Sequence, residues 1–329
     1  LKQSTDCQKV INFQKLQNMK FKEIIQPFLE YKKDYVRMST LSNYADSYDN
    51  HLVPYFGEYS EIKQEDIDEF LFKKANQGAS KKTLENYVVA LKTLFKWANK
   101  NKMFPALSFK ANYPFVAKEK IEINPLTVDE AKAFAKYCEE NFSFIRLALY
   151  TALFTGLRAG EICGLQFKDI DIERGVLSVN KIVTRVTISE RLRKENEKPT
   201  KVTIGPPKTK GSIREIPLTK QVLHFYKSLS KIVNPDFFVA TNNLLPTEPN
   251  SLRNELNNII DILGIQPIRL HDLRHTFATR CVSVGIDPKT VSLLLGHSTV
   301  DITLKLYTHV DDDAKTEAIN KLSKKMLWD

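Results

Sequence analysis

A proline-containing stretch, residues 104–125, interrupts the periodic patterns of the chain and divides the sequence in two. It holds Pro105, Pro114 and Pro125 and shows no helical or strand period, so we expect an extended interdomain linker. The length of 329 residues also favours two domains. The expected parts are a linker or coupling segment (1–18), a helical bundle (19–103), the linker (104–125), a second domain (126–310) and a C-terminal helix (311–329).

Apolar residues at helical spacing predict four helices before the linker, over 20–36, 39–56, 64–76 and 80–102. Short connections between them favour a compact four-helix bundle. Lysines along one face of a helix usually mark a face exposed to solvent, and this is the simpler interpretation of the lysines in the last helix. The alternative is a DNA-contacting face with hydroxyls, amides and lysines at helix starts. Its members are Ser39, Thr40, Asn43, Tyr44, Ser80, Lys81, Lys82 and Thr83. Lys210, which follows the linker in the sequence, is a further residue expected to contact DNA.

The second domain is predicted to be mainly α with a small antiparallel β sheet. Helices are expected over 127–140, 144–156, 219–233 and 250–263, and strands over 176–179 and 181–188. A hairpin is expected around the turn TKGS, with Lys208 and Lys210 at its start. The polar stretch 189–201 is long for a turn and is predicted to be a mobile insertion. The whole chain is then mainly α, with an α/β second domain.

The net charge of +10 and the pI of about 9.2 favour a polyanionic partner, nucleic acid first and an anionic membrane surface second. The four cysteines are far apart and form no C-x-x-C pair, so neither a zinc module nor a disulfide framework is indicated. No apolar run approaches the roughly 18 residues that span a bilayer, and no signal peptide is visible. We therefore expect a cytoplasmic protein with reduced thiols.

Residues 268–309 contain four side chains that can handle a phosphate: His271, Arg274, His297 and Tyr307. A phosphodiester under attack gains charge on its equatorial oxygens, which Mg²⁺ or rigid guanidinium groups can stabilise. No metal site is predicted, because the acidic run 311–313 is typical of a helix start. His271 and His275 have zinc-like spacing but lack the Glu of that motif. The charge is then expected to come from two arginines, with Arg158 of TGLRAGE as the second.

The order of the motifs, TGLRAGE, KTK, HDLR, LGH and then a tyrosine, resembles the tyrosine recombinase (phage integrase) family from Lys20 to about Asp329. The resemblance implies a SAM-like core-binding bundle followed by a tyrosine recombinase catalytic domain. It assigns the phosphate clamp to Arg158 and Arg274, and the general acid to Lys208, with Lys210 as the alternative. His271 becomes the acid/base partner of the nucleophile, His297 a phosphate donor, Tyr307 the nucleophile and Glu161 the residue that orients the site.

The resemblance further implies cleavage and rejoining of double-stranded DNA through a 3'-phosphotyrosine, without cofactor, metal or ATP. The expected enzyme is an integrase of a phage or conjugative transposon, acting as a homotetramer on element ends. An excisionase or a host DNA-bending protein would assist it in the nucleoid of a bacterial host. Residues 311–329 would dock on a neighbouring protomer. The Leu start suggests that an N-terminal arm-binding domain was removed.

Two other functions stay open at this point. A type IB topoisomerase resembles the same catalytic set but relaxes supercoils as a monomer. A non-catalytic DNA-binding protein on the same fold is the other alternative, although Tyr307 and both arginines argue against it.

Overall fold

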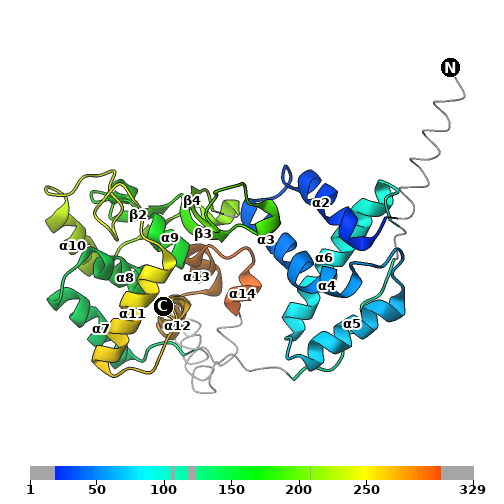
Figure 1. Cartoon of the computed structure of the whole chain (residues 1–329). Coiled ribbons are helices and arrows are strands. Elements are labelled where there is room, and N and C mark those ends of the chain that lie inside the picture. Colours follow the sequence, from blue (N-terminus) through cyan, green and yellow to red (C-terminus); the bar gives the residue numbers. More distant parts are fainter. Residues whose placement is uncertain (1–18, 105–107, 118–123, 208, 305–329) are drawn as a thin grey trace, which may run out of the picture. The chain divides into compact units, whose positions relative to one another are not determined.

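The computed structural model describes residues 19–104, 108–117, 124–207 and 209–304 (Figure 1). The chain forms two compact units, which we describe separately. The first takes the chain up to residue 121 together with 186–201, and the second takes 122–185 and the chain from 202 onward.

The first unit is a helical bundle. Its helices are α2 (Phe21–Lys32), α3 (Met38–Ser47), α4 (Val53–Phe56), α5 (Gln64–Asn76) and α6 (Lys81–Lys100). A π-helical turn, η1 (Tyr48–Leu52), joins α3 to α4, so the predicted second helix is three pieces in one continuous path. The core is rich in aromatic rings, and the buried Tyr48 hydroxyl donates to the Ala90 carbonyl at 3.0 Å. The pairing of this hydroxyl fits the rule that buried polar atoms find partners.

Residues 186–201 pack on α3 within the first unit, around the short 3₁₀ turn η3 (Glu190–Leu192). The Ser189 amide donates to Ser42 Oγ at 3.0 Å, and Arg191 Nε donates to Asp49 Oδ1 at 2.7 Å. Leu192 packs against the bundle core. The expectation of a mobile insertion was wrong: this polar stretch has specific partners on the bundle.

The second unit is built around α8 (Phe144–Thr155), which α7 (Val128–Glu140), α11 (Pro249–Leu263) and α12 (Leu270–Ser283) contact. Its apolar residues are buried on nearly every side, as expected for a central helix. The remaining elements are α9 (Ala159–Gly164), η2 (Phe167–Asp169), β1 (Ile170–Asp171), β2 (Val176–Val179), β3 (Ile182–Thr187), β4 (Thr200–Gly205), η4 (Lys210–Ser212), β5 (Arg214–Pro217), α10 (Lys220–Leu229), α13 (Pro288–Leu295) and α14 (Val300–Leu304).

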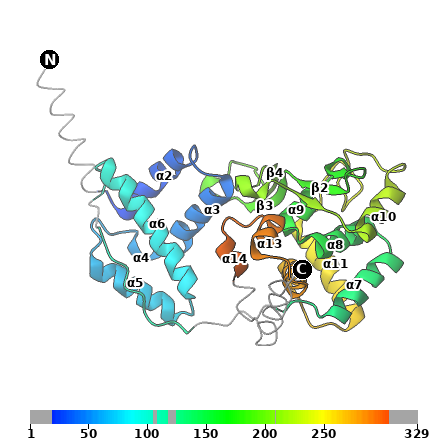
Figure 2. The ribbon, with the colours of Figure 1, turned by 180° about the vertical axis from the view of Figure 1, so that it is seen from behind.

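The strands form two small sheets. An antiparallel sheet has the order β1-β2-β5, with Leu177 opposite Ile216, and β3 pairs with β4 in a second sheet. The hairpin expected around TKGS was wrong, because β4 and β5 pair with different strands and η4 connects the two sheets. The fold class is confirmed: the protein is mainly helical with small sheets (Figure 2). No helix of the described ranges has the length and apolar character to cross a bilayer.

Gly156 ends α8 in the left-handed conformation, with φ of 65°, and lies against α12 and α13. A Cβ at this position would come within 2.6 Å of the Phe277 ring and 2.7 Å of Leu295. Gly264 ends α11 with φ of 64° but has nothing within 4 Å of the same position. Both glycines therefore need the left-handed backbone conformation, but only Gly156 has neighbouring side chains close to the position of a Cβ atom.

We predict that Gly156→Ala lowers the unfolding free energy of the second unit by about 2–4 kcal/mol, since left-handed strain and overpacking add. Gly264→Ala is the matched control and should cost only the strain, about 1–2 kcal/mol. Urea unfolding followed by circular dichroism measures both. Equal losses for the two variants would contradict the packing role of Gly156.

Candidate active site

Arg158 stands at the N-cap of α9, directly after the turn that ends α8. Its Nη1 donates to Glu161 Oε1 at 2.9 Å, and its Nη2 donates to the Gly296 carbonyl at 2.8 Å. The Glu161 carboxylate also accepts from the Arg158 amide at 2.9 Å. The Arg158 side chain is nevertheless 35% exposed, so its guanidinium is fixed and still accessible.

Arg274 reaches the same place from the buried side of α12. Its Nη1 donates to the Gly156 carbonyl at 2.8 Å and its Nη2 to the Leu295 carbonyl at 2.7 Å. Burial, followed by the charge of Arg158, lowers the pKa of Arg274 to about 9. The group therefore remains a cation at neutral pH, and two guanidinium groups are held at the end of α8.

His297 follows Gly296, the left-handed residue that ends α13. Its Nδ1 lies 2.7 Å from the hydroxyl of the buried Thr303 on α14. When the hydroxyl donates to Nδ1, the proton of the neutral ring is on Nε2, which can then donate to an anion. Partial burial, then the charges of Arg274 and Arg158, lower the pKa of His297 to about 4.

His271 lies in the first turn of α12, edge to face with His275 at 4.6 Å between ring centroids. Desolvation by its neighbours, then the charges of His275 and Arg274, lower the pKa of His271 to about 4. The pKa of His275 is lowered by partial burial as well. Both rings are therefore neutral at pH 7, and the accessible one, His271, can accept a proton.

A cavity of about 400 Å³ opens beside Arg158. Its walls come from α9, from β3 and the chain after β4, and from the turn after α13. The lining includes Arg158, Glu161, Pro207, Thr209, Ser212 and Gly296. Pro207 and Thr209 flank Lys208 in the sequence, so the cavity adjoins the loop that carries this lysine.

The structure thus brings together Arg158, Glu161, Arg274 and His297, and it places His271 on the same helix as Arg274. Lys208 and Tyr307 lie outside the described residues, as does the expected C-terminal helix. Lys210 belongs to η4, but its side chain is outside the description. Among the described residues, no group of three or more His, Cys, Asp and Glu side chains could hold a metal ion.

Sequence reasoning missed Arg214, which donates to Glu161 from β5. A signal was present, because residues two apart in a strand share a face. Arg214 and the buried Ile216 are such a pair, so the strand pattern places the arginine side chain toward the interior.

In the first unit, a polar hollow of about 460 Å³ lies between α3, η1 and α6. It gathers four of the residues predicted to contact DNA: Thr40, Asn43, Tyr44 and Thr83. It also exposes Asn50 and Asn86, which the sequence reasoning did not select. Ser39, Ser80, Lys81 and Lys82 are not part of its lining. Ser80 caps α6, where its Oγ accepts from the Thr83 amide, and Lys82 pairs with Glu85.

Comparison with known proteins identifies the class. Residues 124–314 match the phage integrase family, and residues 20–75 match the phage integrase N-terminal SAM-like domain. The chain therefore belongs to the phage integrase family, and it is an enzyme of the tyrosine recombinase type.

Individual relatives support this assignment. A XerC-like tyrosine recombinase of Caldanaerobacter subterraneus subsp. tengcongensis is 33% identical over 318 residues, covering 88% of this chain and 79% of that protein. The ICEBs1 integrase of Bacillus subtilis is 24% identical over 288 residues, covering 83% and 74%. The structure of the Tn1549 transposon integrase bound to transposon right end DNA has a similar fold. Its TM-score is 0.69 at 21% identity, over 93% of this chain and all of that one.

We predict a histidine-dependent loss of stability in mild acid. Between pH 6.5 and 4, the unfolded chain protonates histidines that stay neutral in the folded protein, so stability falls as pH falls. His297→Gln should make this slope shallower by less than about 1.4 kcal/mol per pH unit, the limit for one proton. Urea unfolding of the two proteins between pH 5 and 7 measures the slope. His224→Gln on α10 is the matched control, and an unchanged slope in His297→Gln would refute the assignment.

Proposed function

We propose that this protein is a site-specific DNA recombinase that cleaves and rejoins DNA through a 3'-phosphotyrosine. The observation that carries the proposal is the pair of guanidinium groups fixed at the end of α8. Arg158 and Arg274 are each held by backbone carbonyl oxygens and lie next to His297. Such preorganised cations stabilise the charge that develops on the equatorial oxygens of an attacked phosphate.

In the proposed reaction, the Tyr307 hydroxyl oxygen attacks the scissile phosphorus and its proton passes to His271. Because the pKa of His271 is lowered, its imidazole is neutral at pH 7 and has a ring nitrogen that can accept the proton. The bond to the 5' oxygen breaks, and that oxygen takes a proton from Lys208 or Lys210. His297 donates a hydrogen bond to the phosphate.

The 3'-phosphotyrosine keeps the energy of the broken bond. A 5' hydroxyl can therefore attack it and release the tyrosine without ATP. Arginines and a lysine supply the charge and the proton, so the proposed step uses no metal or other cofactor.

Double-stranded DNA is the proposed substrate, and the bundle 19–103 and the catalytic domain 126–310 are both proposed to bind it. Asn43, Asn50 and Asn86 line the hollow of the first unit. Asparagine pairs with adenine edges through two hydrogen bonds, and hydroxyl groups contact phosphates. The basic pI of about 9.2 supports the same partner.

The relatives suggest the biological setting, integration and excision of a mobile element in a bacterial cell. Among them are an ICEBs1 integrase and the transposase of transposon Tn916 from Enterococcus faecalis. Element ends are then the proposed sites, in the nucleoid, and an excisionase or host DNA-bending protein is a proposed accessory partner. Relaxation of supercoils without exchange would instead favour the type IB topoisomerase alternative.

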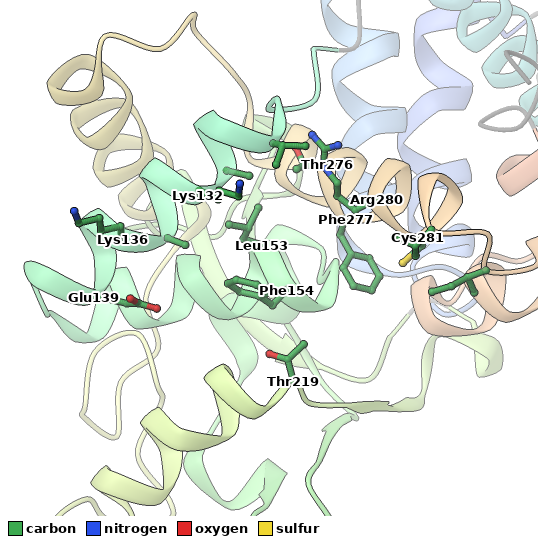
Figure 3. A pocket seen from close by; sticks show the side chains of 15 residues that line it. Lys132, Lys136, Glu139, Leu153, Phe154, Thr219, Thr276, Phe277, Arg280 and Cys281 are labelled. Atoms are coloured by element: carbon green, nitrogen blue, oxygen red, sulfur yellow. The ribbon is translucent and has the colours of Figure 1, made fainter. Parts of the chain in front are cut away.

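We propose that four protomers assemble on DNA, with residues 311–327 of one copy seated on the next. An apolar groove of about 490 Å³ in the second unit is the proposed receptor (Figure 3). Its lining includes Phe277 and Cys281 of α12 and Leu153 and Phe154 of α8. The charged residues Lys132, Lys136, Glu139 and Arg280 line it too. At helical spacing, Ala314, Ala318, Ile319 and Leu322 of the segment would form an apolar side that suits the apolar lining of the groove.

We predict that Tyr307→Phe binds a suicide DNA duplex as well as the wild type does but forms no covalent adduct. The phenol oxygen is the atom that would join the phosphate, and its removal leaves the rest of the site intact. Denaturing gels measure the adduct, and mobility shifts measure binding. An adduct in the variant would remove Tyr307 as the nucleophile. Absence of any adduct in the wild type on element-end DNA would defeat the proposed function.

We predict that Val284→Asp weakens assembly of the tetramer at least about tenfold while single-site binding is unchanged, because a charge would be buried under the docked segment. Val284 is 73% exposed, so the substitution should not disturb the fold. Ile232→Asp is the matched control, since Ile232 is 76% exposed and lies away from the groove. Analytical ultracentrifugation of DNA complexes measures assembly. If truncation after Val310 weakens assembly and Val284→Asp does not, the tail docks elsewhere.

A further inference from the structure

We propose that Arg214 is a positioning residue of the active site, which neutralises Glu161 from the protein interior and so leaves Arg158 free to bind the phosphate. This inference rests on the proposed function and extends it to a side chain that is not part of the lining of the cavity beside Arg158.

The contacts of Arg214 join three parts of the second unit. Nη1 and Nη2 donate to the two carboxylate oxygens of Glu161 at 3.1 and 2.9 Å. Nε donates to the Leu294 carbonyl at 2.6 Å, and Nη1 also donates to the Ser212 carbonyl at 3.1 Å. One side chain therefore fixes the start of α9, the end of α13 and the loop before β5.

Arg158 and Arg214 share Glu161 but differ in how many of their N–H donors are already used. A guanidinium has five N–H donors. The four contacts of Arg214 occupy nearly all of them, and its side chain is only 6% exposed. The side chain of Arg158 makes two such contacts and is 35% exposed. Arg214 has little left to offer a phosphate, whereas Arg158 keeps several donors and access to the cavity.

The charge balance gives the reason for a second cation. The Glu161 side chain is 2% exposed, and a buried carboxylate without compensation is costly. Burial would raise the pKa of Glu161, but the hydrogen bonds and charge of Arg214, followed by those of Arg158, outweigh it and lower the pKa. Without Arg214, Arg158 would be the remaining partner of the carboxylate, and its charge would be drawn away from the phosphate.

Arg214 also packs against the turn that precedes His297. A Cβ on Gly296 would lie 3.1 Å from Arg214 Cδ, from its Nη1 and from the Gly211 carbonyl. The absence of a side chain at Gly296 thus lets the turn approach the guanidinium closely. Arg214 therefore packs against Gly296, and Arg158 donates a hydrogen bond to the Gly296 carbonyl oxygen.

The test compares Arg214→Met and Arg214→Lys with the wild type in single-turnover cleavage of a suicide duplex. Arg146→Met is the matched control, because Arg146 also pairs with a glutamate, Glu255, and donates to a backbone carbonyl, but at the opposite end of α8. We expect both Arg214 variants to cleave on the order of 100-fold more slowly, as small displacements of reacting groups do. DNA affinity should change less than about twofold, and Arg146→Met should cleave like the wild type.

A neutral substrate separates positioning from general destabilisation. A methylphosphonate at the scissile position carries no charge and needs less stabilisation by Arg158. The defect of the Arg214 variants should shrink to under about tenfold on this substrate, whereas a folding defect would affect both substrates equally. Normal cleavage of the phosphate by Arg214→Lys, or equal defects on both substrates, would overturn the inference. If Arg214→Met does not fold, Arg214→Lys decides. Wild-type protein that forms no adduct would instead reject the proposed function.

Discussion

The candidate site depends on arginines that are held by carbonyl oxygens at helix ends. Gly156 ends α8 and Gly296 ends α13, both in the left-handed conformation. The carbonyls of Gly156 and Gly296, with that of Leu295, accept hydrogen bonds from Arg274 and Arg158. Helix C-termini carry partial negative charge and unpaired carbonyls, so they favour cations. Two helix ends thus fix two guanidinium groups without using a carboxylate for each.

This arrangement keeps the site cationic. A carboxylate partner for each of Arg158 and Arg274 would have neutralised their charge. Backbone carbonyl oxygens orient the two guanidinium groups without neutralising them. Glu161 is shared by Arg158 and Arg214, whereas Arg274 donates to the Gly156 and Leu295 carbonyls. Burial first, and then neighbouring positive charge, lower the pKa of His297 and His271 to about 4, so the rings stay neutral. Neutral imidazoles beside fixed cations are suited to move protons and to donate hydrogen bonds near a phosphate.

Local signals in the sequence predicted most helices and the residues that meet at the site. Periodicity located α5 and α7 closely, and the helix expected over 144–156 matches α8. The pairing of strands could not be read in this way, since β4 and β5 flank a plausible turn but pair with β3 and β2. The packing of 186–201 on α3 depends on contacts between distant residues, such as Arg191 with Asp49, that no local pattern encodes. Lys208 and Tyr307 stay predictions.

One side chain of the groove packs beside a backbone anchor of the site, and this contact bears on how assembly could control cleavage. Phe277 lines the groove, and its ring lies where a side chain on Gly156 would be. The Gly156 carbonyl holds Arg274, one turn before Phe277 on α12. A segment that fills the groove would therefore press on the ring that packs against the Arg274 anchor. Because close-packed interiors transmit such displacements, docking of a neighbour and alignment of the clamp would be mechanically linked.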